Sequence, residues 1–360
     1  MNKGSIVLVG GPASGKTNYI ARLWLAFMAR KGRLRAQKLP ENIEYVNEAV
    51  QHLLARKFAP RSERNLEESG RHDFVVKVRG NDGAGPERDI TVPDITGELW
   101  RRAIKSYELP QEWMDALASS SSAILFVRAH SRLNLQPMDW VTARDHLMGH
   151  CDEDDDEEED DGYGDDEDED GNPIPSPAAS ANADDAVEPP EGQPAEGQVE
   201  YLNGDGNDAD IVETDAAVQE PEQVVIKRDN LPAQVGFCEL YRYLTLKLAD
   251  RPSGARPRLA VVVTAWDMLD AEAKAAGPVR YLEEQFPMFA GRLKTPGRLD
   301  VEVFGMSIVG GNLRGTANKQ FRDSLKKRDL SEVGYTAMMR DGVMVEDPDV
   351  TLPLEWALGD

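Results

Sequence analysis

The sequence predicts an α/β domain in which a mostly parallel sheet is covered by helices on both faces. A short β-branched run, Ser5 to Val9, leads through a glycine-rich turn into a helical pattern. Two later runs, Ala123 to Arg128 (AILFVR) and Arg258 to Thr264 (RLAVVVT), are apolar almost throughout, as is typical of central parallel strands buried on both faces. Helical segments separate these strands, and this alternation favours a parallel or mixed sheet.

Several further elements are expected before residue 120. Apolar residues at helical spacing predict helices over Thr17–Arg30 and Glu41–Lys57, whereas Ala59–Gly70 is polar and aperiodic and is interpreted as a loop. Phe74–Arg79 and Asp89–Pro93 are predicted strands that form a hairpin or lie at the sheet edge, because proline suits a strand end. One helix is expected to begin after Gly97 and another to span Gln111–Ala118.

Helical and strand patterns return in the last third of the chain. The expected elements are helices over Gly236–Ala249, Tyr281–Phe289 and Asn318–Lys327, and a strand over Asp300–Ser307. No internal repeat is evident.

Charge is distributed unevenly along the 360 residues. The chain holds 41 lysines and arginines against 65 aspartates and glutamates, a formal net charge of −24. Residues 152–226 hold 29 of the acidic residues and no lysine or arginine, so the rest of the chain is nearly balanced. Because low-complexity sequence with high net charge buries too little apolar surface to order itself, we predict a disordered acidic insertion. We therefore expect a first domain part (1–150), the insertion (151–226), and the remainder of the domain with a C-terminal extension (227–360).

Composition also excludes several classes of protein. Two cysteines, Cys151 and Cys238, rule out a disulfide scaffold and suit a reducing compartment. The N-terminus lacks the features of a signal peptide, and no apolar run approaches the ~18 residues of a membrane span. There is no strong nucleic-acid signal either. We expect a cytoplasmic protein without a membrane segment, and its oligomeric state stays open.

A phosphate-binding pattern lies between the first strand and the first helix. Residues 10–17 (GGPASGKT) satisfy G-x-x-x-x-G-K-[ST], the P-loop or Walker A pattern. Glycines let the backbone N–H groups point at phosphate oxygens, and the following helix presents its positive N-terminus to the same anion. Lys16 is expected to reach the β- and γ-phosphates and the Thr17 hydroxyl to ligate Mg²⁺. The predicted nucleotide-binding residues are Gly10, Gly11, Pro12, Ala13, Ser14, Gly15, Lys16 and Thr17.

A second motif follows the strand that ends at Pro93. Residues 94–97 (DITG) have the form D-x-x-G. An aspartate at the carboxyl end of a strand beside a P-loop can hold Mg²⁺, and the glycine can donate its backbone N–H to the γ-phosphate. The alternative is that Asp94 caps the next helix. Because the motif follows a P-loop, we favour a metal role for Asp94 and a γ-phosphate role for Gly97.

A third motif ends the strongest apolar strand. Residues 264–267 (TAWD) have the form T-x-x-D. The Asp267 carboxylate can accept hydrogen bonds from guanine N1–H and the exocyclic amine, which adenine cannot offer in that arrangement. The alternative is that Asp267 caps the helix that follows. Given the P-loop, we predict that Thr264 and Asp267 contribute to a base-binding site.

These three motifs, in this order, resemble those of the translation-factor-related class of GTPases, which share a Ras-like core. The resemblance covers about residues 5–330 without the insertion, and it implies a P-loop three-layer sandwich with Ras-like strand order. It places Ser307 in the family's last base-contacting loop and Glu98 beside the attacking water, as a catalytic residue with Lys16. The extra helix before the second strand and the ending 348–358 (PDVTLPLEWAL) are similar to bacterial double-GTPase proteins of conflict or defence loci.

The sequence departs from this class at three places. Family members usually have lysine second in the [NT]-K-x-D motif, with its stem along the base, whereas this chain has Ala265. Glu98 stands where glutamine often orients the attacking water. The usual first-switch threonine is missing. The candidates to replace it are Ser62 and Ser69, and those for a cis arginine finger are Arg61 and Arg64, although ordinary solvated loop is the simpler interpretation of all four.

The resemblance implies a GTP-binding, Mg²⁺-dependent GTPase that acts as a molecular switch on a protein partner, an activator or effector. One alternative is an ATPase or a P-loop kinase of a small molecule, which Ala265 keeps open. Another is a nucleotide-gated binding module with negligible turnover, which Glu98 and the missing threonine favour. The acidic insertion is either a solvated spacer or a polyanion that occupies a basic surface, with Arg101–Lys105 as a target in the same chain.

Overall fold

The structure is a computed structural model that describes residues 3–37, 44–60, 73–80, 88–93, 97–106, 108–129, 232–295 and 297–359. The strands are β1 (Lys3–Val9), β2 (Leu34–Ala36), β3 (Asp73–Gly80), β4 (Arg88–Pro93), β5 (Ser122–Arg128), β6 (Arg258–Thr264), β7 (Asp300–Ser307), β8 (Tyr335–Arg340) and β9 (Val343–Asp347). The α-helices are α1 (Lys16–Ala29), α2 (Glu44–Leu54), α3 (Gly97–Ser106), α4 (Gln111–Ala118), α6 (Ala233–Lys247), α7 (Ala271–Ala276), α8 (Pro278–Gln285), α9 (Pro287–Lys294), α10 (Lys319–Lys326) and α11 (Leu352–Leu358). Short 3-10 helices are η2 (Trp266–Met268), η3 (Thr316–Asn318) and η4 (Leu330–Glu332).

The described strands form one mixed sheet in the order β2-β3-β4-β1-β5-β6-β7-β8-β9. Strands β4, β1, β5, β6 and β7 run parallel in the centre, and the strands that flank them are antiparallel. Strand β5 pairs with β6 in register from Ser122↔Arg258 to Arg128↔Thr264, so the segments before residue 130 and after residue 231 build the same sheet. The carboxyl ends of the parallel strands therefore meet at one edge of the sheet.

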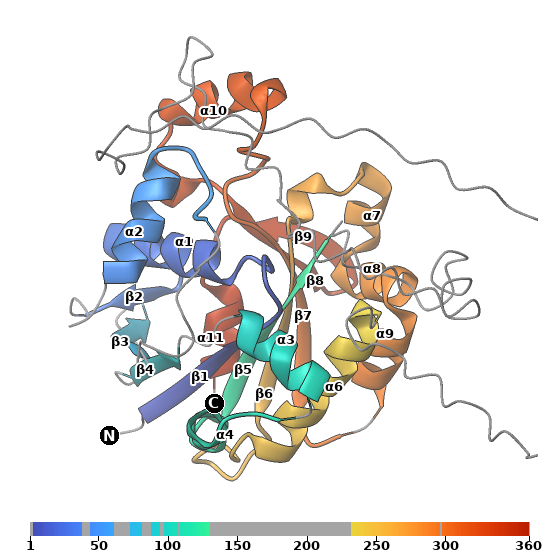
Figure 1. The fold of residues 1–360 in the computed structure, drawn as a ribbon. Helices are drawn as coiled ribbons and strands as arrows, with labels where there is room; N and C mark the ends of the chain where they lie inside the picture. The colour runs from blue at the N-terminus through green and yellow to red at the C-terminus, as the bar shows by residue number, and fades with distance from the viewer. Residues whose placement is uncertain are drawn as a thin grey trace, which may run out of the picture. The chain divides into compact units, whose positions relative to one another are not determined.

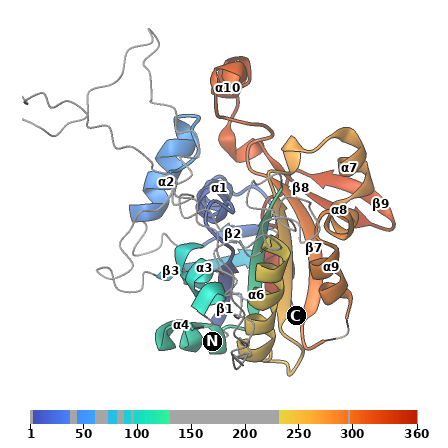
Figure 2. The same cartoon turned by 45° about the vertical axis from the view of Figure 1, so that its right-hand side comes forward.

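Helices cover both faces of the sheet, as predicted (Figure 1). Along β1, Ile6 and Leu8 belong to the core beneath α1, α2 and α11, whereas Val7 and Val9 belong to the core beneath α3, α4, α6, α8 and α9. Strands β5 and β6 alternate in the same way, and their apolar residues are fully buried. Figure 2 shows α1 and α6 on opposite sides of the sheet. This two-sided burial explains why the central strands are apolar almost throughout.

One predicted helix is wrong. The helix expected over 281–289 is two helices, α8 and α9, separated at Phe286, whose backbone (φ −136°, ψ 58°) is not helical. Pro287 lacks the N–H that a continuous helix needs, so it starts a new helix instead. The strands at 74–79 and 89–93 are confirmed as an antiparallel pair, β3 and β4, near one edge of the sheet.

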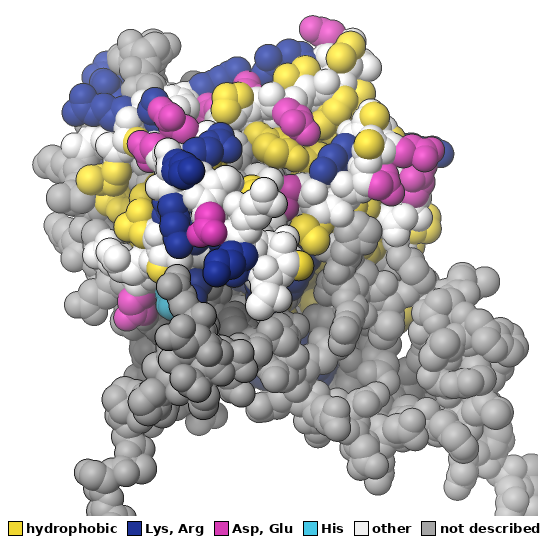
Figure 3. Space-filling view, turned by 90° about the horizontal axis from the view of Figure 1, so that it is seen from above, with side chains coloured by type: hydrophobic (Ala, Val, Ile, Leu, Met, Phe, Trp, Pro, Cys, Tyr) yellow, Lys and Arg dark blue, Asp and Glu magenta, His cyan; other side chains and the backbone are white. Residues whose placement is uncertain are grey.

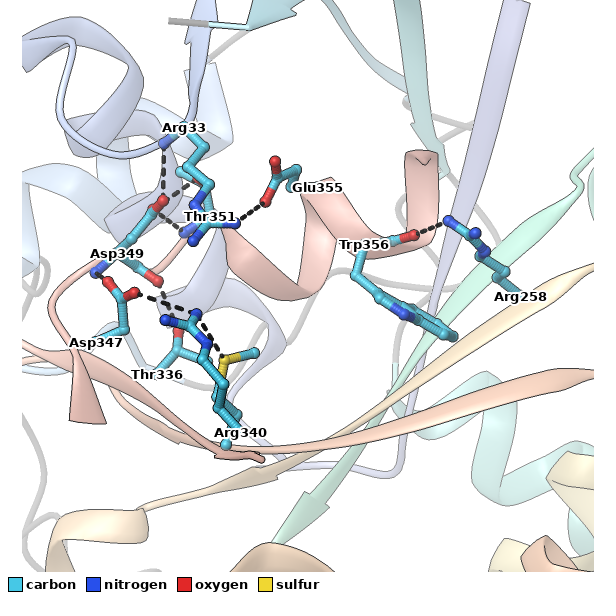
Figure 4. Close-up of polar contacts among 10 residues, drawn as sticks. Arg33, Arg258, Thr336, Arg340, Asp347, Asp349, Thr351, Glu355 and Trp356 are labelled. Atoms are coloured by element: carbon cyan, nitrogen blue, oxygen red, sulfur yellow. Dashed lines mark hydrogen bonds and ion pairs between the residues drawn. The ribbon is translucent and has the colours of Figure 1, made fainter. Parts of the chain in front are cut away.

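In the C-terminal segment, residues 329–359, η4 contacts α1, β8 and β9 extend the sheet beyond β7, and α11 packs on β5 and β6. Only an extension was expected here from the sequence. The Asp349 carboxylate accepts hydrogen bonds from the Arg33 N–H (2.7 Å) and from the N–H (2.8 Å) and hydroxyl (2.7 Å) of Thr351 (Figure 4). The buried guanidinium of Arg22, on α1, donates to the carbonyl oxygens of Ser331 and Val333. Burial lowers the pKa of Arg22 to about 10. These contacts tie the segment to the helix that follows the P-loop.

Among the described residues, no helix combines the length and the apolar character needed to cross a membrane. The acidic insertion lies outside the described residues, so its predicted disorder and the domain boundaries at 150 and 226 remain predictions.

Candidate functional site

The P-loop connects β1 to α1 at the carboxyl edge of the sheet. Gly10 has φ +154°, and a Cβ on it would lie 2.8 Å from Ser14 Oγ and 3.1 Å from the Phe126 carbonyl oxygen. Gly15, with φ +95°, is the residue before α1, and no side chain caps that helix. The loop therefore needs glycine at both ends, and the first N–H groups of α1 point toward the space that it encloses.

Lys16 folds over the loop that precedes it. Its Nζ donates to the carbonyl oxygens of Gly10 (2.6 Å) and Gly11 (3.0 Å) and lies 3.4 Å from Ser14 Oγ. The ammonium group is therefore held above the curled backbone, where it can meet a phosphate oxygen. Thr17, one residue on, is half-buried in the first turn of α1.

The second motif touches the P-loop through its glycine. A Cβ on Gly97 would collide with the backbone N of Pro12 and would lie 2.6 Å from the Gly11 carbonyl carbon. Gly97 is buried at the first position of α3, so the start of this helix lies directly on the P-loop. Only glycine permits such an approach, because any side chain would displace the loop.

Asp94 lies outside the described residues, and the side chain of Glu98 is likewise not described, although its backbone lies in α3. Ser62, Ser69, Arg61 and Arg64 also lie outside the described residues.

The third motif is joined to the P-loop by a buried hydrogen bond. The Thr264 hydroxyl donates to the Ser14 carbonyl oxygen at 2.9 Å. Ala265 follows in a left-handed conformation (φ +56°), which turns the chain sharply after β6. Trp266 is then fully buried, and its ring packs on Gly305 of β7, where a Cβ would lie 2.5 Å from a ring carbon. The loop is thus anchored at both of its sides.

Asp267 is held by the last residue of β7. The Ser307 hydroxyl donates to Asp267 Oδ1 at 2.6 Å, and the Gly310 N–H donates to Ser307 Oγ at 2.9 Å. Lys274 Nζ donates to the Asp267 carbonyl oxygen at 2.8 Å. The cap of α7 is Asp270, so the alternative that Asp267 caps this helix is wrong.

Tyr335 is a neighbour of this carboxylate that the sequence did not indicate. It pairs with Ser307 across β7 and β8. Burial raises the pKa of the Tyr335 hydroxyl, and the negative charges of Glu346 and Asp267 raise it further. The Tyr335 hydroxyl therefore stays protonated, and its side-chain hydrogen bond is with Glu346.

Arg128 is a second residue that sequence reasoning did not single out. It ends β5, and its guanidinium donates to the Ala13 carbonyl oxygen of the P-loop at 3.3 Å. The sequence shows only a charged residue after an apolar run, and the strand order is what brings it to the P-loop.

The predicted magnesium ligands are chemically suited to that ion. A threonine hydroxyl and a carboxylate supply the oxygen ligands that Mg²⁺ prefers, and Thr17 stands directly after Lys16 at the start of α1. Within the described part of the chain, no group of three or more histidine, cysteine, aspartate or glutamate residues could hold a metal ion.

Basic side chains gather on the face that is seen from above (Figure 3). Helix α10 and the residues after it contribute the exposed Lys319, Lys326, Lys327 and Arg328. The Arg56 guanidinium, just after α2, donates to the Leu325 carbonyl oxygen of α10 at 2.9 Å. Acidic side chains are interspersed with the basic ones, and Lys326 pairs with Asp323 at 3.1 Å. The basic stretch that the sequence analysis named as a target, Arg101–Lys105, lies on α3, where Arg101 and Arg102 are exposed.

Comparison with known proteins identifies one family. A family model described as Double-GTPase 1 matches residues 7–357, which is nearly the whole chain. No curated protein and no solved structure matches the sequence.

Proposed function

The chain belongs to the Double-GTPase 1 family, and from this premise we propose that it binds GTP and hydrolyses it with Mg²⁺ as a molecular switch. The family supports the general activity of a GTP-binding GTPase. The residue roles, the switch mechanism and the biological setting that follow are our proposal.

The observation that carries the proposal is the hydrogen bond from Thr264 to Ser14. It fixes the third motif to the P-loop, so a phosphate site and the Asp267 carboxylate belong to one rigid arrangement. Ser307 orients that carboxylate from the next strand end. A carboxylate held in this way suits the N1–H and exocyclic amine of guanine, and a base without those donors would leave it unpaired.

We assign the phosphate end to the P-loop and to the start of α3. The backbone of residues 10–15 and Lys16 hold the phosphates, and Thr17 and Asp94 hold Mg²⁺, which neutralises phosphate charge when bound. Gly97 donates its N–H to the γ-phosphate, consistent with its contact on Gly11 and Pro12. Glu98 lies beside the attacking water and takes the place of the usual glutamine.

The switch follows from the position of Gly97. Because the start of α3 lies against the P-loop, a γ-phosphate bound there would contact both segments, and its loss would remove the contacts that it makes with them. We propose that segments 59–70 and 94–102 respond to this loss and present different surfaces to a protein activator or effector. We further propose that the protein works in the cytoplasm of a bacterium, in a conflict or defence system.

One observation favours a second candidate, an ATPase or a P-loop kinase of a small molecule. Ala265 offers only a methyl group where the related GTPases place a lysine stem, so part of the usual guanine contact is missing from the motif itself. A binding module with negligible turnover is the third candidate, because Glu98 replaces the usual glutamine.

Base preference separates the first two candidates. Unlabelled GTP and ATP would compete with a fluorescent guanine nucleotide in the presence of Mg²⁺, on the wild type and on Asp267→Asn. We expect GTP to win on the wild type and Asp267→Asn to shift the preference toward xanthosine triphosphate, because an amide offers a donor where the carboxylate only accepts. Asp270→Asn, in the cap of α7, is the matched control and should leave the preference unchanged.

Hydrolysis is tested separately with Lys16→Ala. We expect this substitution to abolish phosphate release by purified protein, because the Lys16 ammonium group is held over the P-loop, where it meets the β- and γ-phosphates in our proposal. Equal competition by ATP, with no effect of Asp267→Asn, would transfer the protein to the ATPase or kinase class. GTP binding without measurable phosphate release by the wild type would favour the binding module.

A further inference from the structure

We infer that Arg128 supplies the cation that the T-x-x-D motif lacks at Ala265, by holding the P-loop at Ala13 and lying against the face of the guanine base. This inference rests on the proposed function, because it concerns the base of the same bound nucleotide. It adds a residue from a different strand to the specificity of the site.

The side chains of Arg128 and Thr264 donate hydrogen bonds to neighbouring carbonyl oxygens of the P-loop. They are directly paired at the ends of β5 and β6, and the Ala129 N–H donates to the Thr264 carbonyl oxygen at 3.0 Å. From these adjacent positions, the Arg128 guanidinium reaches the Ala13 oxygen (3.3 Å) and the Thr264 hydroxyl reaches the Ser14 oxygen (2.9 Å). The two side chains therefore act as one clamp on the base side of the loop.

The strand order places Arg128 on the path of the nucleotide. Strand β5 lies between β1, which leads into the P-loop, and β6, which leads to Asp267. A nucleotide with its phosphates over residues 10–15 and its base at Asp267 must cross the carboxyl end of β5. Arg128 is the last residue of that strand, and it is half-buried there.

The chemistry of the two positions is complementary. Ala265 has a methyl group and a left-handed backbone, so it offers the base neither a long stem nor a charge. A guanidinium is planar and always charged, stacks well on an aromatic ring and keeps N–H groups at its edge for a carbonyl oxygen. Arg128 can thus contact the base with its face while its edge stays on Ala13.

The test compares a whole nucleotide with a ligand that has no base. Affinities of GDP and of inorganic tripolyphosphate would be measured with Mg²⁺ by competition against a fluorescent guanine nucleotide. The proteins would be the full-length wild type, Arg128→Ala, Arg128→Gln and the double variant Arg128→Ala/Ala265→Lys. Arg280→Ala is the matched control, since Arg280 is exposed on α8 and pairs with Glu283 and Glu284. Thermal unfolding would confirm that each variant is folded.

We expect Arg128→Ala to weaken GDP binding about tenfold and tripolyphosphate binding at most about threefold, because only GDP loses the base contact. Arg128→Gln keeps a polar group without the cation and should behave like Arg128→Ala. Ala265→Lys should restore most of the GDP affinity to Arg128→Ala, because a lysine in the usual place of the motif carries the charge back to the base. Lysine is no more strained than alanine at this backbone position.

Three results would overturn the inference. An equal loss of GDP and tripolyphosphate affinity would make Arg128 a support of the P-loop alone. Unchanged GDP affinity in a folded Arg128→Ala or Arg128→Gln protein would show that Arg128 has no role in nucleotide binding. If Ala265→Lys failed to restore GDP affinity to Arg128→Ala, Arg128 would not be the substitute for the lysine of the motif. Absence of guanine-nucleotide binding by the wild type itself would overturn the proposed function, and this inference with it.

Discussion

The Thr264 hydroxyl and the Ser14 carbonyl oxygen are joined by a buried hydrogen bond of 2.9 Å, although the two residues are 250 positions apart in the sequence. The bond crosses from the end of β6 to the P-loop that follows β1. It makes the geometry of the phosphate-binding backbone depend on the motif that carries Asp267.

Loss of this bond should weaken nucleotide binding. Thr264→Val removes the donor and leaves the Ser14 carbonyl unpaired, so we expect affinity to fall by about 0.5–1.5 kcal/mol, or roughly two- to tenfold. Thr264→Ser keeps the hydroxyl and is the matched control. Isothermal titration with GDP and Mg²⁺ measures both variants, and equal affinities for valine and serine would show that the bond does not support the site.

Addition of one methyl group at Gly97 should disrupt the contact between α3 and the P-loop. A Cβ there meets the backbone of Gly11 and Pro12, which cannot rotate away as a side chain would. We expect Gly97→Ala to lower stability by about 1–3 kcal/mol and to reduce the preference for a triphosphate over a diphosphate. Chemical denaturation and competition of GTP analogues against GDP measure the two effects.

Gly291→Ala is the control for this substitution. Gly291 lies inside α9, and nothing lies within 4 Å of the position that its Cβ would occupy. Alanine should therefore be neutral or should stabilise the helix by about 0.5–1 kcal/mol. If Gly97→Ala behaved in the same way, the close approach of α3 to the P-loop would be wrong.

Ser307 should govern base preference through Asp267. Ser307→Ala removes a 2.6 Å hydrogen bond to the carboxylate and the acceptor of the Gly310 N–H. Because hydrogen bonds to charged groups contribute about 1.5–3 kcal/mol, we expect the preference for GTP over ATP to fall about tenfold or more. Ser120→Ala is the control, because the buried Ser120 hydroxyl bonds to Ala116 and Ser5 near the start of β5, at the opposite edge of the sheet. A GTP preference that is lost equally in both variants would point to general destabilisation.

The elements that surround the motifs could be predicted because their signals are local. Each central strand is a short apolar run, and the helix after the P-loop repeats apolar residues at helical spacing. The break between α8 and α9 also had a local signal in Pro287, which the helical pattern around it outweighed. The sequence also held a local signal for the hairpin of β8 and β9, the dipeptide Asp341-Gly342, whose positive φ angles suit a tight turn.

The contacts that assemble the site could not be predicted, because they depend on strand order and register. Arg128 ends an apolar run, and nothing local shows that β5 lies beside β1 and reaches Ala13. Tyr335 approaches Asp267 only because β8 pairs with β7 at Ser307. The role of Asp267 as a helix cap was a reasonable alternative in the sequence, and the position of Asp270 three residues later decides against it.

Asp349 should stabilise the fold from the C-terminal segment, away from the predicted nucleotide-binding residues. Asp349 is buried and accepts three hydrogen bonds from Arg33 and Thr351. Its negative charge also raises the pKa of Arg22, and so partly offsets the lowering that burial causes. Asp349→Ala leaves these donors and a buried guanidinium without the carboxylate, so we expect a loss of about 3–5 kcal/mol in the free energy of unfolding.

Glu355→Gln separates this effect from a simple change of charge. Glu355 pairs with the same Arg33 at 3.2 Å, but both side chains are more than a third exposed, so its loss should change stability by less than about 1 kcal/mol. Urea denaturation measures the free energy of unfolding of both variants. Asp349→Asn tests whether a side chain of the same shape is enough to keep the stability, since its amide places an N–H donor against the donors of Arg33 and Thr351. Because Asp349 joins the C-terminal segment to the turn after α1, its substitution should also lower nucleotide affinity in proportion to the unfolded fraction. Affinity that falls while Asp349→Ala remains fully folded would instead show that this segment acts on the P-loop through α1.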